Sequence, residues 1–131
     1  MQEKIRTIAT DKAPSAIGPY SQAKIAGGFL FASGQIAIDP ATGAIDGEDI
    51  RTQTKRVMDN IGAILAEAGA SYDDVVKTTC FLAEMGDFAA FNEVYANYFP
   101  AKPARSCVAV KSLPKEVLCE VEIIAFIGSE D

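Results

Sequence analysis

Arg105, in the stretch PARSCV, stands at the start of a run of residues typical of a β-strand. An arginine stays protonated at any physiological pH, and burying it without an anionic partner costs far more than one packing contact returns. Its partner is therefore either a carboxylate of this chain or the carboxylate or phosphate of a ligand. The planar guanidinium can hold a ligand carboxylate through two parallel hydrogen bonds.

Two glutamates interrupt the apolar stretch VLCEVEIIAFI near the C-terminus. Strand alternation puts Glu120 and Glu122 on one face, where a carboxylate can hold a water molecule or carry a proton. In the preceding strand Arg105 shares a face with Cys107, and it can approach either glutamate across a strand pair or a subunit contact. Two interpretations remain open: a buried Arg–Glu pair that serves only strand registry, or a substrate-binding arginine with a glutamate that handles protons or water.

Other polar positions lie in short motifs that each allow two interpretations. Tyr20 in IGPYS is either a core aromatic or a residue that closes a pocket with its hydroxyl. Ser33 and Gly34 in ASGQI form a turn at a strand end, or bring a hydroxyl and bare backbone close to a ligand. Asn92 either bridges two elements or lies on a solvated helix surface. Cys107 is expected to pack, with its backbone groups near a ligand, because no histidine is present to act as its base.

The composition excludes several classes of site. The 131 residues, 49% of them hydrophobic, suffice for a single domain spanning 1–131. The excess of acidic over basic residues, 18 against 12, disfavours nucleic acid as a partner. The chain has no histidine, and its cysteines fall in no CxxC spacing, so we expect neither a metal site nor a disulfide framework. Phosphate-binding glycine motifs do not occur either.

The chain has no apolar run long enough to span a bilayer, and its start, MQEKIRTIATDK, lacks the layout of a secretion signal. These features predict a cytoplasmic protein with no membrane partner.

Hydrophobic periodicity predicts which elements position these residues. Period-two patterns predict strands, and apolar residues at intervals of three and four predict two helices. The order gives two strand–helix–strand crossovers, which favours an α+β sandwich with one mixed sheet and both helices on one face. The other face then needs a cover, and self-association is the simplest one. The expected strands are 4–10, 23–26, 29–38, 75–85, 105–113 and 117–127, and the expected helices are 49–68 and 88–99.

The chain resembles the RidA branch of the YjgF/Rid family, the reactive intermediate (enamine/imine) deaminases. Five motifs carry this resemblance, in the order and at approximately the spacing of the family: IGPYSQA, ASGQI, FNEVYANYF, PARSCV and LPKEVLCEVE. The resemblance implies a chorismate-mutase-like (ferredoxin-like) protomer. It also implies a homotrimer with a barrel-like core, whose sites lie in clefts between subunits.

The resemblance further implies hydrolysis of 2-aminoacrylate and 2-iminobutyrate to pyruvate and 2-oxobutyrate, with release of ammonia and without a cofactor. By position, Arg105 resembles the arginine that binds the substrate carboxylate, Glu120 the residue that positions the attacking water, and Tyr20 the pocket tyrosine. Two alternatives remain. One is a non-catalytic trimer that binds small 2-oxo acids, and the other is RNA cleavage, which the acidic charge balance disfavours. The matching substrate-binding positions are Ser33, Gly34, Asn92 and Cys107.

Overall fold

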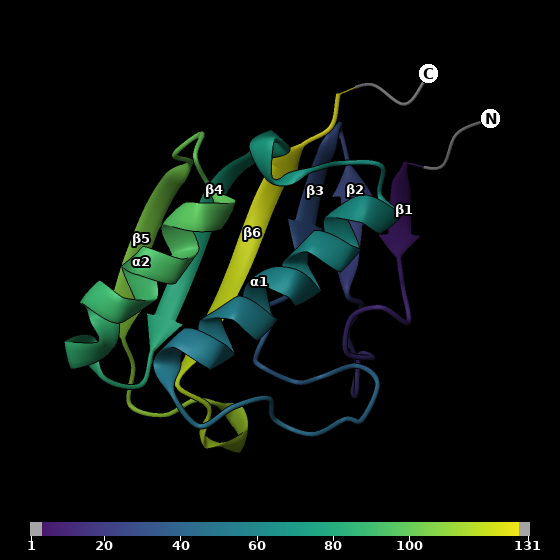
Figure 1. Ribbon diagram of the computed structural model, residues 1–131. Helices are drawn as coiled ribbons and strands as arrows, with labels where there is room; N and C mark the ends of the chain where they lie inside the picture. The colour runs from purple at the N-terminus through teal and green to yellow at the C-terminus, as the bar shows by residue number, and fades with distance from the viewer. Residues whose placement is uncertain (1–3, 129–131) are drawn as a thin grey trace.

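In the computed structural model, which describes residues 4–128, the chain forms one six-stranded sheet with strand order β1-β2-β3-β6-β4-β5. Only β4 and β5 pair in parallel, and the other pairs are antiparallel. Both helices lie across one face of the sheet, as predicted (Figure 1). The elements are β1 (Ile5–Ile8), β2 (Ala23–Ala26), β3 (Phe29–Ala32), α1 (Ile50–Glu67), β4 (Val75–Leu82), α2 (Phe88–Tyr98), β5 (Ala104–Ala109) and β6 (Cys119–Phe126).

The β2–β3 hairpin turns at Gly27 and Gly28, whose φ angles of 58° and 84° suit glycine. The predicted third strand, 29–38, is too long, because β3 ends at Ala32. Beyond it the chain leaves the ladder and returns only as an isolated bridge between Gln35 and Val121. Residues 33–38 are therefore irregular, and they do not continue the alternation of β3: Leu30 and Ala32 are buried at even positions, whereas Gln35 and Ala37 are buried at odd ones.

Helix α1 confirms the expected range of 49–68. Asp49 is its N-cap, and the carboxylate of this residue accepts a hydrogen bond from the backbone N–H of Thr52 at 3.1 Å. Gly69 ends it with a φ of 76°. Helical spacing brings one apolar stripe into the core, with Val57, Ile61, Ile64 and Leu65 buried. None of the helices within residues 4–128 is long and apolar enough to cross a membrane.

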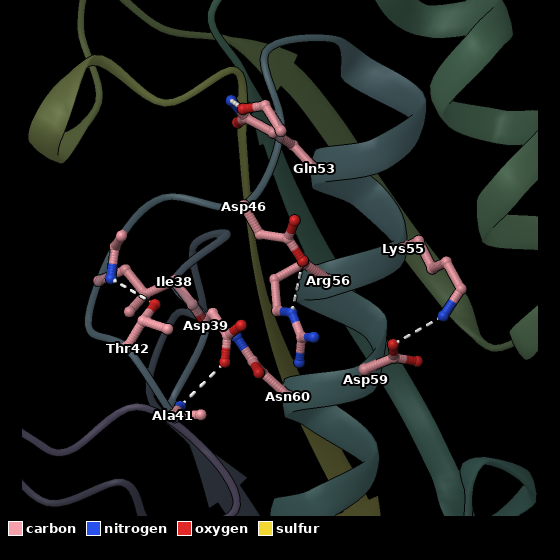
Figure 2. Close-up of polar contacts among 12 residues, drawn as sticks. Ile38, Asp39, Ala41, Thr42, Asp46, Gln53, Lys55, Arg56, Asp59 and Asn60 are labelled. Carbon is pink, nitrogen blue, oxygen red and sulfur yellow. Dashed lines mark hydrogen bonds and ion pairs between the residues drawn. The ribbon is translucent and has the colours of Figure 1, made fainter.

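Buried amides on α1 fix the irregular segments that run beside it (Figure 2). Asn60 donates from Nδ2 to the carbonyl oxygens of Ile36 and Ile38, at 3.1 and 3.0 Å. Gln53 accepts from the backbone N–H of Leu118 at 2.8 Å. Because a buried backbone carbonyl or N–H without a partner is costly, these bonds hold segments 33–38 and 113–118 in place.

Helix α2 carries the predicted aromatic stripe, and Phe91, Tyr95 and Phe99 are buried between the helix and the sheet. The rings of Tyr95 and Phe99 are 4.7 Å apart, which is typical of packed aromatic pairs. Phe88, at the first turn, is only partly buried against the core. The stripe thus fixes which side of α2 faces β4 and β5.

The sheet has one face covered by the helices and one that residues 4–128 leave open. Phe29, Phe31 and Phe126 on the open face are 38%, 47% and 50% exposed, and the rings of Phe29 and Phe126 lie 5.0 Å apart. Such a contiguous aromatic patch is characteristic of a surface that contacts another molecule. Strand β6 shows the predicted alternation, with Cys119, Val121, Ile123 and Ala125 buried beneath the helices and Glu120, Glu122, Ile124 and Phe126 on the open face.

Candidate active site

A pocket of about 610 Å³ opens beside the end of β3 and the start of β6. Five of the residues singled out from the sequence line it together: Tyr20, Ser33, Gly34, Glu120 and Glu122. We call it the Glu120 pocket. The structure therefore brings three separate sequence motifs to one cavity.

The carboxylate of Glu120 lies against the backbone at Gly34. A Cβ atom added to Gly34 would overlap the Glu120 carboxylate, so a glycine is required for this close approach. The pKa of Glu120 is raised above its ordinary value by partial burial and then by the neighbouring charge of Glu122. A carboxylate in this environment is a stronger base than one in water.

Tyr20 is 53% exposed and lines the pocket, so it is not a core aromatic. The hydroxyl of Ser33 donates to the carbonyl oxygen of Ser21 at 2.6 Å, which ties the end of β3 to the loop that carries Tyr20. Since a hydroxyl has one proton to donate, Ser33 is left to accept a hydrogen bond from a ligand rather than donate one.

Gln22 was not predicted to matter, yet its buried side chain anchors the Tyr20 loop. It accepts from the backbone N–H of Thr10 at 2.6 Å and donates to the carbonyl oxygens of Thr10, Ala13 and Pro14, at 3.0, 3.3 and 2.7 Å. The signal in the sequence was a glutamine that directly follows a loop rich in proline and glycine, where backbone groups lack regular partners.

A second cluster, which we call the Arg105 group, contains Arg105, Asn92 and Cys107. Arg105 donates from Nη1 to Oδ1 of Asn92 at 2.7 Å, so Asn92 bridges α2 and β5. The guanidinium lies over the rings of Phe88 and Tyr95, with Cζ 5.5 and 4.9 Å from the ring centroids. Within residues 4–128 no aspartate or glutamate forms an ion pair with Arg105.

Within one chain Arg105 does not form the expected Arg–Glu registry pair across adjacent strands, and the same pair across a subunit contact stays a prediction. β4 lies between β5 and β6, and Arg105 is the register partner of Thr78 while Glu120 is that of Phe81. Thr78 is buried beneath the helices, whereas Glu120 is on the open face. The Arg105 group and the Glu120 pocket are thus on opposite faces of one chain.

The three thiols offer little to a metal or a substrate. Burial raises the pKa of Cys80 and of Cys119 to about 12, and it also raises the pKa of Cys107. The thiols are therefore protonated and poorly nucleophilic at neutral pH. Among residues 4–128 no cluster of three Cys, Asp or Glu residues is arranged to hold a metal ion.

Comparison with known proteins identifies the family. The family model described as Endoribonuclease L-PSP matches residues 10–127. A RutC family protein of Pyrococcus abyssi is 59% identical over 91% of this chain and 94% of its own length. The 2-iminobutanoate/2-iminopropanoate deaminase of Salmonella typhimurium is 46% identical over 92% of this chain and 96% of its own.

A solved structure shows the same fold. The crystal structure of E. coli TdcF with bound serine has a TM-score of 0.89 and 42% sequence identity, and the match covers 94% of this chain and 99% of that one. Identity at this level over nearly the whole length establishes common family membership. The chain therefore belongs to the Endoribonuclease L-PSP family, the family of the RidA proteins, since its relatives include the Reactive Intermediate Deaminase A of Arabidopsis thaliana and the RidA of a Psychrobacter species.

Proposed function

We propose that this protein hydrolyses 2-imino acids and their enamine tautomers, such as 2-iminobutyrate and 2-aminoacrylate, to 2-oxo acids and ammonia. The observation that carries the proposal is Arg105, a half-buried cation whose neighbours within residues 4–128 include no carboxylate partner. A ligand carboxylate is the partner that such a guanidinium lacks. The deaminase name of one relative and the serine bound to another support a small carboxylate substrate.

In this proposal a complete site takes the Arg105 group from one copy and the Glu120 pocket from the next. The two clusters face opposite sides of one chain, so a single copy does not supply both to one substrate. The exposed phenylalanines of the open face offer an apolar surface for a homotrimer with a barrel-like core. Three equivalent contacts would then give sites between subunits.

The proposed mechanism uses orientation, one water molecule and proton transfer. Arg105 holds the substrate carboxylate, and Glu120 holds a water molecule against the imine carbon. The water oxygen bonds to the carbon of the protonated imine while Glu120 accepts one water proton, and Glu120 then gives that proton to the nitrogen of the resulting carbinolamine. The C–N bond breaks and ammonia leaves, as the carbinolamine hydroxyl gives its proton to Glu120 and becomes the carbonyl. The raised pKa of Glu120 suits it to this transfer.

The other pocket residues orient the reacting groups in this scheme. The hydroxyl of Tyr20 and the backbone at Ser33, Gly34 and Cys107 surround the imine nitrogen, and Asn92 holds the arginine. A protonated imine beside a carboxylate is already electrophilic, so no cofactor is required. We further propose that residues 1–131 act as a single Rid-type domain in the cytoplasm, with no nucleic-acid or membrane partner.

The test couples a PLP-dependent threonine dehydratase to this protein and traps the released imine with semicarbazide, while 2-oxobutyrate is followed. Wild type is expected to outcompete the trap, and Arg105→Ala to lose this ability with its fold and assembly intact. Arg105→Lys is the matched control, since it keeps the charge but lacks the two-pronged geometry, and we expect it to be strongly impaired. A trapped fraction that wild type does not change would favour a trimer that only binds 2-oxo acids.

A further inference from the structure

The guanidinium of Arg105 contacts neutral groups and forms no ion pair within the described residues. Asn92 accepts one hydrogen bond at 2.7 Å, and the rings of Phe88 and Tyr95 lie beneath the guanidinium. An aromatic face attracts a cation through its quadrupole, and it does so more strongly where water is excluded. The ring faces thus stabilise the charge without neutralising it.

The ring of Tyr95 is itself held in place from the sheet. Tyr95 is 8% exposed, and its hydroxyl lies 2.7 Å from Oγ1 of Thr78, which is fully buried. Thr78 is also the register partner of Arg105 on the neighbouring strand. Each pair among Thr78, Tyr95 and Arg105 is therefore in contact: Thr78 and Arg105 by strand pairing, Thr78 and Tyr95 by their hydroxyls, and Tyr95 and Arg105 by the ring face.

The titratable neighbours of Arg105 add no negative charge. Burial raises the pKa of the Tyr95 hydroxyl and of the Cys107 thiol, and it raises the pKa of the Cys80 thiol to about 12. All of them are neutral at physiological pH. Within residues 4–128, therefore, no neighbouring group of the same chain neutralises the positive charge of Arg105.

We propose that Tyr95, together with Thr78 and Phe88, is a positioning residue that fixes Arg105 while leaving its charge uncompensated. A carboxylate in the same place would also hold the guanidinium, but it would compete with the substrate carboxylate. The neutral groups around Arg105, which are Asn92, Phe88 and Tyr95, avoid this competition and leave most of the N–H donors of Arg105 for the ligand. The inference rests on the proposed role of Arg105 as the substrate-carboxylate site.

The first experiment compares Tyr95→Leu with Tyr95→Phe, which keeps the ring. Tyr95→Leu is expected to raise KM, and the dissociation constant for 2-oxobutyrate measured by calorimetry, by about five- to tenfold. We expect kcat to change less than KM, because Tyr95 acts on the binding of the substrate carboxylate through Arg105. Tyr95→Phe, which keeps the ring but loses the hydroxyl contact with Thr78, should give values between those of Tyr95→Leu and wild type. Phe91→Leu is the matched control, since it removes another buried ring of α2 that has no cation–π contact with Arg105.

The second experiment places a carboxylate beside the arginine with Asn92→Asp. This isosteric change is expected to raise Tm, because it pairs Arg105, and to weaken 2-oxobutyrate binding more than Asn92→Ala does. Binding should recover as the pH is lowered and the introduced carboxyl is protonated. A residue that served only to support the fold would not produce higher stability with weaker, pH-dependent binding.

The results separate the two proposals. If wild type binds 2-oxobutyrate with these dependences but does not hydrolyse the imine, the positioning role stands and the deaminase proposal fails. If wild type hydrolyses the imine and both Tyr95→Leu and Asn92→Asp leave KM and the dissociation constant unchanged, the positioning role is wrong. Absence of both turnover and binding in wild type would overturn both.

Discussion

Arg105 and Glu120 lie on opposite faces of the same sheet, with strand β4 between their strands. A change of side-chain rotamer cannot carry either group through a packed sheet, so one substrate can meet both only between two copies. Activity should therefore depend on how the subunits are arranged.

Mixed assemblies of two inactive variants test that arrangement. Arg105→Ala and Glu120→Gln are each expected to be inactive alone. Co-expressed in equal amounts, they should regain about a quarter of the wild-type sites, because random assortment places an intact Arg105 group against an intact Glu120 pocket at that frequency. Imine turnover by the purified mixture measures it. Activity that stays at the level of the single variants would show that both groups must come from one chain.

Gly34→Ala is expected to lower kcat by about tenfold or more without unfolding the protein. The added methyl group would overlap the end of the Glu120 side chain, which can swing away, so the clash moves the carboxylate rather than the backbone. Thermal unfolding and turnover distinguish these effects. Gly86→Ala is the control, because nothing lies within 4 Å of a Cβ added there. Equal activity of the two variants would contradict the placement of Glu120 at the reacting carbon.

The charge of Glu122 should set part of the pH dependence. Burial and then Glu122 raise the pKa of Glu120, and turnover requires the ionised carboxylate, so activity falls as the pH drops through that pKa. Glu122→Gln removes the like charge and is expected to move the acid limb of kcat/KM to lower pH. Activity at neutral pH should stay within about twofold. Glu67→Gln, at the end of α1, should leave the profile unchanged, and a shift to higher pH in Glu122→Gln would oppose the assignment.

Gln22→Ala should loosen the Tyr20 loop. The substitution leaves the backbone partners of the amide at Thr10, Ala13 and Pro14 without their hydrogen bonds, and we expect a loss of about 1–3 kcal/mol in the free energy of unfolding. Trypsin should then cleave after Lys12 faster than in wild type. Gln35→Ala serves for comparison, because Gln35 is another buried glutamine and its side-chain amide donates to the carbonyl oxygen of Ser33 at 3.3 Å. Unchanged cleavage after Lys12 would mean that Gln22 is not the anchor.

Local chemistry was sufficient to predict the helices from the sequence. Asp49 and Gly69 mark the ends of α1, and the aromatic spacing from Phe88 to Phe99 marks α2. Both signals act within a few residues, so they do not depend on the rest of the fold. The alternation of β6 was predictable for the same reason.

The end of β3 was not predictable in this way. The stretch 29–38 reads as one strand, but a strand continues only while a neighbour pairs with it, and β6 pairs with β3 only near Phe29, Leu30 and Phe31. Long-range pairing and the amide of Asn60 decide where residues 33–38 run. The Glu120 pocket follows from that irregular path.

By itself, the sequence predicted candidate residues for the chemistry and determined which of them share a face: Arg105 with Cys107, and Glu120 with Glu122. It could not determine whether these two pairs lie on the same side of the sheet, because this depends on the strand order β6-β4-β5 and on where the helices lie. The tertiary structure decided that Arg105 meets Asn92 and two aromatic rings instead of a glutamate. The physical reason is that side-chain alternation is a property of each strand, whereas strand order comes from contacts between distant parts of the chain.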